Sequence, residues 1–353
     1  MLKQKRTWIG LAFILFTFYF LFRNIDKDKF LAALAHFQLI WLVPALSIYM
    51  FGYVIRGFRW VVLLSPIKKC KFTSLFPTLI VGFMANNVLP ARAGEFIRAH
   101  LNGTKEGISR SASFATIILE RLFDGLTMII LLWASLSLGH LPIQESTMPA
   151  SIQHAIDWSP WVFGSAFLIL FGLLLFKELA IKVIGFFISL APSKFHEPME
   201  KLAHTFIDGL TILKSAKESI LVLTFSLVAW ACEFTSYYFF GVGMGIAPSP
   251  LTLWSSALLM AIVNLGILIP NAPGGIGLFE FIGVALLLPF GVQKETAVGY
   301  MFLVHFLVLI PITLLGFYFY RHEHIQLNAI EKDDKPAPRT KKTLRPKKRK
   351  VSK

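Results

Sequence analysis

Long apolar runs separated by charged loops dominate the hydrophobic pattern of this chain. A helix needs about 20 apolar residues to cross a bilayer, and a run near that length predicts a span. Two other apolar regions, residues 72–110 and 251–289, are interrupted by proline and glycine. The runs that predict transmembrane helices are residues 8–22, 39–55, 111–138, 163–176, 221–243 and 298–320.

The clearest interruption lies in residues 264–283, where an apolar run stops and later resumes. Between its two parts stand Pro270, Pro273, Gly274 and Gly275. Proline removes an amide donor and glycine adds backbone entropy, so a continuous helix is costly there. Backbone that is not helical is tolerated at membrane depth only where protein buries it or where it lines a wet cavity. The pattern therefore predicts two half-helices that meet at a break.

An earlier stretch, residues 86–98, shows the same interruption 180 residues upstream. Pro90 corresponds to Pro270 and Gly94 to Gly274, each after an apolar run. Paired interruptions at corresponding places in two halves are typical of the binding site of a transporter. The alternative is two unrelated Pro-Gly loops between ordinary spans, because the matching pattern is short.

The charges of the loops predict the orientation of the spans, since cytoplasmic loops are rich in Lys and Arg. Residues 56–71 and 177–218 are basic, whereas residues 139–160 contain no Lys or Arg. One uninterrupted span lies between the first basic loop and residues 139–160, so the region 72–110 must enter and leave on the same face. By the same reasoning, the region 251–289 must enter and leave on the outer face. It is then either a re-entrant pair or a hairpin of two full spans.

We therefore expect an all-α polytopic membrane protein with about six full spans and two broken re-entrant helix pairs in an inverted repeat. The first repeat is expected over residues 1–138 and an external loop over 139–160. The second repeat is expected over residues 161–320, including the cytoplasmic segment 177–218, and a polybasic cytoplasmic tail over 321–353. Basic residues before the first run place the N-terminus inside, and no cleavage site follows that run.

Composition strengthens the membrane assignment. The 353 residues are 55% hydrophobic with a mean hydropathy of +0.64, against roughly 45–50% apolar residues in soluble domains. The net charge is +15, and much of it comes from residues 331–353, which contain 11 Lys and Arg and three acids. A basic segment after a final span is typical of binding to anionic lipid headgroups and does not indicate nucleic acid. The two cysteines and the lack of nucleotide, zinc or redox motifs predict no metal and no cofactor.

Charged residues within the 111–138 span are candidates for function. Glu120 and Asp124 are four residues apart and share a helix face, and Arg121 can pair with Asp124. They lie roughly 14 to 20 Å along the helix, near the middle of the bilayer. Charges at this depth are costly and usually mark a transport path or a relay. The alternative is a structural ion-pair cluster that holds this helix to the first break, and the two interpretations are compatible.

The two breaks carry the other residues that we expect to bind substrate. A half-helix that starts at a break presents free amides and about half a positive charge. Arginines beside such ends make a site suited to an anion, and phosphate is the natural candidate. For the arginines, the alternative is a solvated loop at the cytoplasmic surface. The predicted binding residues at the breaks are Arg92, Glu95, Arg98, Asn271, Gly274 and Gly275.

Two further acids lie in apolar surroundings. Glu280 stands one turn into the second half-helix, and Glu233 lies in the middle of the 221–243 span. Each is a candidate for binding a coupling proton or sodium ion, or else an isolated neutral acid hydrogen-bonded to backbone. His305, in the last span, is expected to be a core histidine with satisfied hydrogen bonds.

Three motifs carry a resemblance to a known family: Leu89-Pro-Ala-Arg-Ala-Gly-Glu95, Glu120-Arg-Leu-Phe-Asp124 and Pro270-Asn-Ala-Pro-Gly-Gly-Ile-Gly277. In this order they resemble the flippase-like family, which forms the membrane domain of lysylphosphatidylglycerol synthases and their stand-alone relatives. The resemblance covers residues 1–320 and implies a bacterial-type inner-membrane protein that moves lipids between leaflets. The full synthases continue into an aminoacyl-transferase domain. Here 33 mostly polar residues follow Tyr320, so aminoacylation is not carried over.

The expected symmetry concerns the backbone breaks and not the charges. At the offset of 180 residues, Tyr300 and Val304 stand where Glu120 and Asp124 stand in the first half.

The first functional expectation is a transporter that moves an anionic, phosphate-bearing lipid between the leaflets of the inner membrane, with both termini cytoplasmic. Arg92 and Arg98 would pair with the phosphate, and the mid-membrane charges would exchange partners. One alternative is a membrane-embedded transferase on a lipid-linked phosphate, with Glu120 or Asp124 as general base, although no catalytic motif is found. Another is a partner subunit that recruits a lipid-modifying enzyme without transporting anything.

Overall fold

The structure of the chain is a computed structural model. It describes residues 18–139 except 20, 24, 90 and 91, scattered positions between 158 and 189, and residues 216–322 except 268–272. Asn271 lies outside the described residues, as do the tail beyond His322 and nearly all of the spans predicted at 8–22 and 163–176. The described residues form helices and short 3-10 turns, with no strand among them, which confirms the expected all-α class for this part of the chain.

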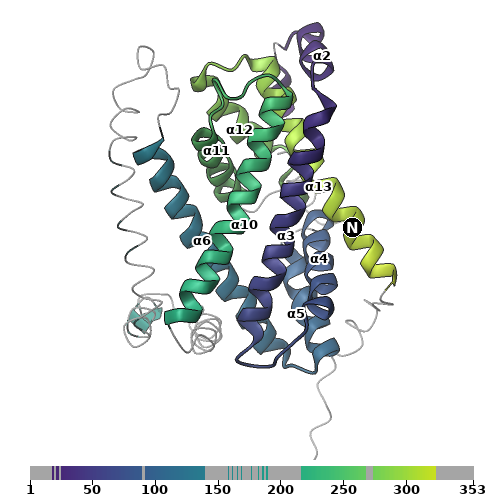
Figure 1. The fold of residues 1–353 in the computed structure, drawn as a ribbon, viewed down its shortest axis with the longest axis vertical. Helices are drawn as coiled ribbons and strands as arrows, with labels where there is room; N and C mark the ends of the chain where they lie inside the picture. Colours follow the sequence, from purple (N-terminus) through teal and green to yellow (C-terminus); the bar gives the residue numbers. More distant parts are fainter. Residues whose placement is uncertain are drawn as a thin grey trace, which may run out of the picture.

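The described helices agree with the apolar runs, and three stretches are long and apolar enough to cross a membrane: Leu39–Leu64, Lys217–Gly243 and Lys294–His322. Three 3-10 turns accompany the helices: η1 (Leu39–Trp41), η5 (Pro273–Gly275) and η6 (Leu288–Phe290). In chain order, the α-helices are α2 (Lys27–Ala35), α3 (Leu42–Leu64), α4 (Phe72–Val88), α5 (Ala93–Glu106), α6 (Arg110–Leu138), α10 (Ala216–Gly243), α11 (Leu253–Gly266), α12 (Leu278–Leu287) and α13 (Lys294–His322) (Figure 1).

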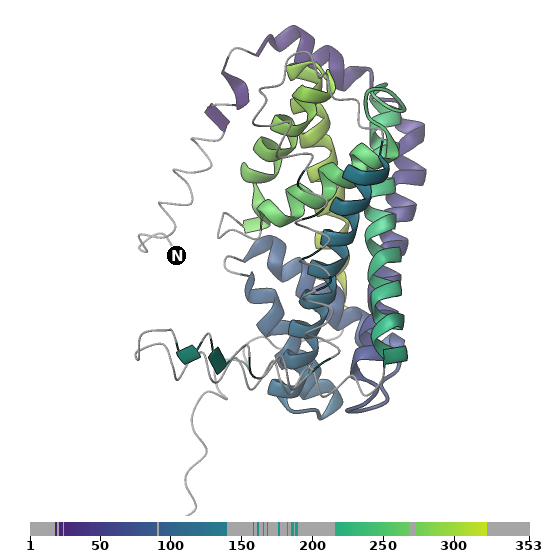
Figure 2. The same ribbon diagram turned by 90° about the vertical axis from the view of Figure 1, so that its left-hand side faces the viewer.

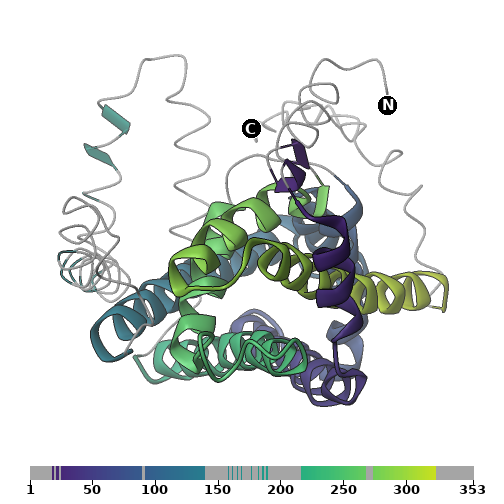
Figure 3. The same ribbon diagram turned by 90° about the horizontal axis from the view of Figure 1, so that it is seen from above.

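In the described part of the chain, four long helices run along the molecule, and two pairs of short helices fill its two ends. Helices α3 and α10 lie side by side and antiparallel, while α4 and α5 occupy the lower half of Figure 1 and α11 and α12 the upper half, as Figure 2 also shows. One helix of each short pair packs against the last long helix of the other half of the sequence: α4 packs against α13, and α11 packs against α6. Seen from above, α2 passes over one end of the bundle and contacts α13 (Figure 3).

The first break brings α4 and α5 into close contact. A Cβ atom added to Gly94 would lie 2.1 Å from the carbonyl oxygen of Gly82 and 2.7 Å from the backbone nitrogen of Asn86. Only a hydrogen atom fits there. Arg92, directly before α5, has a φ of 53°, a left-handed conformation that costs a residue with a side chain about 1–2 kcal/mol. The sharp return between the short helices is therefore built from a glycine contact and a strained residue.

The second break is a glycine-rich turn that touches the first. Gly274, Gly275 and Gly277 have φ values of 68°, 77° and 91°, which glycine adopts without steric cost. A Cβ on Gly274 would lie 3.3 Å from the carbonyl oxygen of Asn87, near the end of α4. The two breaks are therefore neighbours, although they are far apart in sequence.

The basic loop expected over residues 56–71 is shorter than predicted. Helix α3 continues to Leu64, and Arg56 and Arg59 are buried within it at 4% and 0% exposure. The prediction was wrong at this point because a charged residue was taken as the end of the apolar run. The run resumes at Trp60 and extends to Leu64, and acidic partners on other helices make the two buried arginines tolerable.

Candidate functional site: a buried charge network

Six charged side chains from three helices form one ion-paired cluster, which we call the charge network. It has three cations and three anions, so it is electrically balanced. Mutual neutralisation is what makes charged groups tolerable in a medium of low dielectric constant. The members are Arg59 of α3, Glu95 and Arg98 of α5, and Glu120, Arg121 and Asp124 of α6.

Glu120 is the centre of the network and is fully buried. Arg98 donates two hydrogen bonds to its carboxylate, from Nη1 to Oε1 at 3.0 Å and from Nη2 to Oε2 at 2.8 Å. Nη2 of Arg59 lies 3.3 Å from Oε1, and Arg121 also pairs with this oxygen. The Arg98 guanidinium in turn stacks 3.8 Å from the ring centroid of Trp60, whose indole nitrogen donates to Thr116. Bidentate geometry of this kind fixes both side chains.

Asp124 connects the network to α3 and α10. Its Oδ1 accepts from Nη1 of Arg59 at 2.5 Å and from the indole Nε1 of Trp230 at 2.9 Å. Its Oδ2 lies 3.3 Å from Nη2 of Arg121, the i,i+3 pair expected from the sequence. Nη1 of Arg59 also donates to the hydroxyl of Ser226 at 2.7 Å. Helices α3, α6 and α10 therefore meet at this carboxylate.

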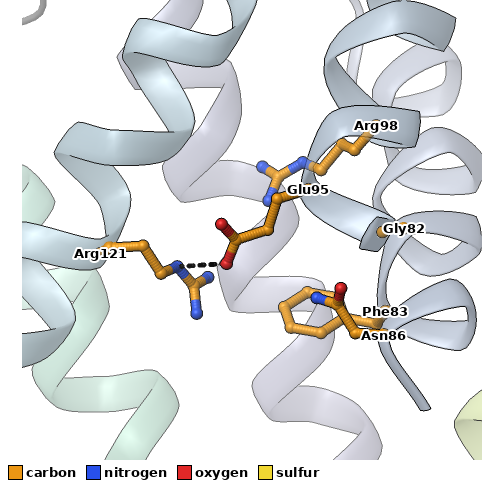
Figure 4. Close-up of a pocket in the computed structure, with 7 residues that line it drawn as sticks. Gly82, Phe83, Asn86, Glu95, Arg98 and Arg121 are labelled. Atoms are coloured by element: carbon orange, nitrogen blue, oxygen red, sulfur yellow. Dashed lines mark ion pairs between the residues drawn. The ribbon is translucent and has the colours of Figure 1, made fainter. Parts of the chain in front are cut away.

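Glu95 is held more loosely than the other two acids. Its Oε1 lies 3.8 Å from Nε of Arg121 and 4.0 Å from Nη1 of Arg92. Figure 4 shows its carboxylate between the side chains of Arg98 and Arg121. Arg92 is 41% exposed and adds a fourth cation at the edge of the network. The edge of the network is thus positively charged and weakly bonded.

A small cavity opens between the first break and the charge network. Its volume of about 10 Å³ is roughly the space of one water molecule. Among the described residues, four lining groups have a buried polar atom without a hydrogen-bond partner: Asn86 Oδ1, Glu95 Oε1, Arg98 Nε and Arg121 Nε. Unsatisfied polar atoms in a native interior need an explanation, and a polar ligand or water is the usual one. The lining residues are Gly82, Phe83, Asn86, Gly94, Glu95, Arg98 and Arg121.

Glu233 is not the isolated acid that the sequence suggested. Its Oε2 accepts from Nη2 of Arg56 at 2.7 Å, and its Oε1 lies 3.4 Å from the amide nitrogen of Asn264. The Arg56 guanidinium lies 5.0 Å from the ring centroid of Tyr53 and 4.7 Å from that of Trp230. Of the two alternatives for Glu233, the isolated neutral acid hydrogen-bonded to backbone was wrong, because Arg56 was assigned to a loop. A role of Glu233 in binding a coupling ion stays a prediction.

Glu280 and His305 form a second buried polar site at the second break. Nδ1 of His305 lies 2.8 Å from Oε1 of Glu280, and its Nε2 lies 2.8 Å from the carbonyl oxygen of Gly274. The other carboxyl oxygen of Glu280 accepts from the backbone amide of Gly277 at 2.8 Å. The His305 ring stacks on Phe279 with centroids 4.1 Å apart. His305 is therefore a core histidine with both nitrogens bonded, as expected.

The structure brings five of the predicted residues into one network, with Arg92 at its edge. Arg98 is buried, so the alternative of a solvated loop arginine does not hold for it. Arg92 precedes α5 and is half-exposed, so this alternative remains open for Arg92. Gly274 and Gly275 lie at the second break, against the end of α4 and not in the network. Arg59 and Trp230 were not predicted as site residues, although an arginine three residues after Arg56 with apolar residues on both sides was a usable signal.

Comparison with known proteins agrees with the motifs. The family model described as lysylphosphatidylglycerol synthase TM region matches residues 7–316. The UPF0104 membrane protein MJ1078 of Methanocaldococcus jannaschii is 26% identical over 233 residues, which cover 65% of this chain and 90% of the relative. The UPF0104 membrane protein PH1989 of Pyrococcus horikoshii is 23% identical over 298 residues, 78% of this chain and 84% of the relative.

A third relative carries an enzyme's name. The glycosyltransferase AglD of Haloferax volcanii is 24% identical over 293 residues, which cover 76% of this chain but 46% of AglD. The family match extends over most of the chain and includes both breaks and the charge network. The chain is therefore a membrane protein that belongs to the family of the lysylphosphatidylglycerol synthase transmembrane region.

Proposed function

We propose that the protein moves an anionic, phosphate-bearing lipid between the two leaflets of the membrane. The observation that carries the proposal is the cavity at the first break, where Arg98 and Arg121 each present a nitrogen without a hydrogen-bond partner and Arg92 adds a cation at the edge. The free amides at the start of α5 add partial positive charge at the same place. A phosphate headgroup could use both, while its acyl chains stay in the lipid.

The arrangement of the helices supports a transporter. In this proposal, α4–α5 and α11–α12 are re-entrant pairs that enter from opposite faces, and the repeats 1–138 and 161–320 have inverted topology. Two features favour it: the pairs occupy opposite halves of the molecule, and each packs on the last long helix of the other half. Binding sites between such repeats are typical of secondary transporters.

Glu95 would act as an internal substitute for the phosphate. The cavity holds about one water, so a phosphate group can enter only if a side chain moves. Glu95 is the least tightly bound acid, at 3.8 Å from Arg121 and 4.0 Å from Arg92. Displacement of Glu95 would free Arg121 and Arg92 for the headgroup, while Arg98 keeps its two hydrogen bonds to Glu120. Arg98 therefore supports the site, and Arg92 and Arg121 make the first contact.

The location belongs to the same proposal. Exposed Lys68, Lys69 and Lys71 follow α3, at the end of the molecule where α4 starts. Because positive loops stay on the cytoplasmic side, this end would face the cytoplasm of a bacterial-type inner membrane, with both termini on that side. The polybasic tail would then lie beside anionic headgroups of the inner leaflet.

Purified protein in liposomes tests the proposal directly. Fluorescent phosphatidylglycerol in the outer leaflet should become inaccessible to dithionite faster than in protein-free vesicles. The protein should increase this rate less for fluorescent phosphatidylcholine. Arg92→Gln removes the edge cation at a half-exposed position and should slow the anionic lipid by about tenfold, the effect of one charge-assisted contact. Lys29→Gln, on exposed α2, is the matched control and should keep the wild-type rate. Equal rates for both lipids, or none above protein-free vesicles, would contradict the proposal.

A transferase acting on a lipid-linked phosphate is the second candidate, favoured by the similarity to AglD. In that case Glu120 or Asp124 would have to act as a base, yet both are engaged by arginines. The liposome experiment separates the candidates, because a transporter returns the lipid chemically unchanged. The experiment also distinguishes a transporter from a partner subunit, because a partner subunit alone would not move lipid without a second protein. Mass spectrometry of the recovered lipid decides the first point.

A further inference from the structure

We propose that Glu280 and His305 form a proton-binding site that controls the conformation of the second break. Both side chains are buried, at 0% and 5% exposure, and come from different helices, α12 and α13. Together they bond to backbone on both sides of the glycine turn, at the Gly274 carbonyl and the Gly277 amide. Proton binding itself is independent of the proposed function, whereas its link to lipid movement rests on that function.

The hydrogen-bond geometry indicates how many protons the pair carries. A carbonyl oxygen only accepts, so Nε2 of His305 carries the hydrogen that it donates to Gly274 at 2.8 Å. The 2.8 Å contact between Nδ1 and Oε1 of Glu280 then needs one more proton, carried by either the acid or the imidazole. In both forms the pair is neutral overall. If this proton leaves to water, two lone pairs face each other and the contact cannot persist.

The corresponding positions of the first half hold a pair with a fixed charge. Glu280 is the third residue of α12, as Glu95 is the third residue of α5. His305 is the twelfth residue of α13, as Arg121 is the twelfth residue of α6, and in each half the acid faces this side chain. Arginine stays protonated, whereas histidine changes charge near neutral pH. The second half therefore carries the titratable version of the pair.

Few other titratable groups lie on the elements around this pair. Within the described part of the chain, α4, α11 and η5 contain no Asp, Glu, His, Lys, Arg or Tyr. On α3 and α10, Arg56 and Glu233 hold each other, Arg59 belongs to the charge network, and the hydroxyls of Tyr49 and Tyr53 lie 3.1 Å apart. Tyr300 donates to the carbonyl of Tyr237. The remaining charged residues of α2, α10 and α13 stand near helix ends: Lys27, Asp28, Lys29, Lys217, Glu218, Lys294, Glu295, Arg321 and His322.

Loss of the proton would be felt at the other break. Repulsion between the two lone pairs would push the Glu280 and His305 side chains apart. Because these side chains hold the Gly277 amide and the Gly274 carbonyl, their separation would loosen the turn that rests against Asn87 at the end of α4. The first break, with its cavity, lies directly beyond. Proton occupancy at Glu280 and His305 would therefore set how firmly the two breaks pack together, and so couple protons to access at the anion site.

Hydrogen exchange measured by mass spectrometry tests proton binding without any transport. After correction for the intrinsic pH dependence of exchange, the opening constant of amides 274–281 in the wild-type protein should change with pH. Its slope should approach about tenfold per pH unit, the signature of one proton. Glu280→Gln and His305→Gln keep hydrogen-bonding groups of similar shape but remove the titration, so both should flatten the profile. His36→Gln, exposed at the end of α2, is the matched control and should keep it.

The outcomes separate the inference from the proposed function. A wild-type profile without pH dependence, or an unchanged profile in Glu280→Gln, overturns the proton site. In liposomes, an imposed pH gradient should change the rate of anionic-lipid movement by wild type and His36→Gln but not by Glu280→Gln. Lipid movement that ignores the gradient overturns the link between protons and lipid. Absence of lipid movement in every variant overturns the proposed function, and the exchange profiles still decide the proton site.

Discussion

Arg98 of α5 donates two hydrogen bonds to Glu120 of α6, at 3.0 and 2.8 Å, with both side chains buried. This bond joins the short helix after the first break to the long helix beside it. Glu120 is fully buried, so bulk water cannot replace a lost partner and the pair has a structural role. The stability of the first break and the chemistry of the anion site therefore depend on the same carboxylate.

Arg98→Ala should destabilise the protein by about 3–5 kcal/mol, because it leaves a buried charge without its main partner. Thermal unfolding in detergent measures the loss. Arg98→Lys should be intermediate, since lysine keeps the charge but cannot form the bidentate contact. Lys69→Ala, on an exposed loop residue, is the control and should unfold like wild type. An Arg98→Ala protein as stable as the control would contradict a structural role.

Arg121→Ala should cost less stability than Arg59→Ala. The Arg121 side chain is 32% exposed, whereas that of Arg59 is fully buried and bonds to Asp124, Glu120 and Ser226. After loss of Arg121, Asp124 keeps Arg59 and Trp230 as partners. In lipid movement the order should reverse, because Arg121 lines the cavity and Arg59 does not. The two variants measured side by side, for unfolding and for lipid movement, decide whether the two roles are separable.

Gly94→Ala should disrupt the first break, whereas Gly125→Ala should be tolerated. The new methyl group at Gly94 would lie 2.1 Å from the carbonyl oxygen of Gly82, and this backbone atom cannot easily move. Overpacking typically costs about 1–3 kcal/mol, and a backbone clash should reach the upper end. At Gly125, in the middle of α6, an added Cβ meets nothing within 4 Å, so alanine should gain up to about 1 kcal/mol. Equal unfolding temperatures of the two variants would mean that α4 and α5 are not in close contact.

Cys70 should react slowly with maleimide at neutral pH. It lies in the loop between α3 and α4, where burial and the neighbouring Glu106 carboxylate raise the pKa of its thiol to about 11. A raised pKa leaves less thiolate at neutral pH, so the labelling rate should still be rising about tenfold per pH unit at pH 9. A cysteine at exposed Ser65, in a protein lacking Cys70 and Cys232, gives the reference, whose rate should level off near pH 9. A Cys70 profile that levels off with the reference would contradict the raised pKa.

Cysteine labelling also tests the re-entrant pairs. In a background without Cys70 and Cys232, single cysteines at exposed Ser65 and Ser109 flank α4–α5 and should label from one face of the membrane. Cysteines at exposed Ser249 and Gln293 flank α11–α12 and should label from the opposite face. A membrane-impermeant maleimide added to inverted and to right-side-out vesicles distinguishes the faces. Labelling of Ser65→Cys and Ser109→Cys from different faces would contradict a re-entrant first pair.

The backbone pattern was predictable because proline and glycine act locally. Ser111 to Leu138 was expected as one helix and is α6, and the half-helices expected from Gly94 and Gly277 begin at Ala93 and Leu278. The pairing of Arg121 with Asp124 was also predictable, since three helical residues bring them together. Such features depend on neighbours in sequence.

The partners of the charges were not predictable, because they come from other helices. Arg59 reaches Asp124 across 65 residues, and Arg56 reaches Glu233 across 177 residues. The correspondence between His305 and Arg121 was hidden as well, because the second break is longer and shifts the offset from 180 to 184 residues. At the fixed offset of 180 residues, Tyr300 and Val304 correspond to the charged residues of α6. When residues are instead counted from the start of each helix, His305 corresponds to Arg121.

The equal numbers of positive and negative groups in the charge network have an electrical consequence. A membrane potential does work only on charge that moves through it, about 2.3 kcal/mol for one elementary charge across 100 mV. Arg59, Arg98 and Arg121 balance Glu95, Glu120 and Asp124, and the adjacent Arg56 and Glu233 balance each other. A rearrangement that keeps these side chains together carries no net charge across the bilayer, so voltage alone neither drives it nor opposes it.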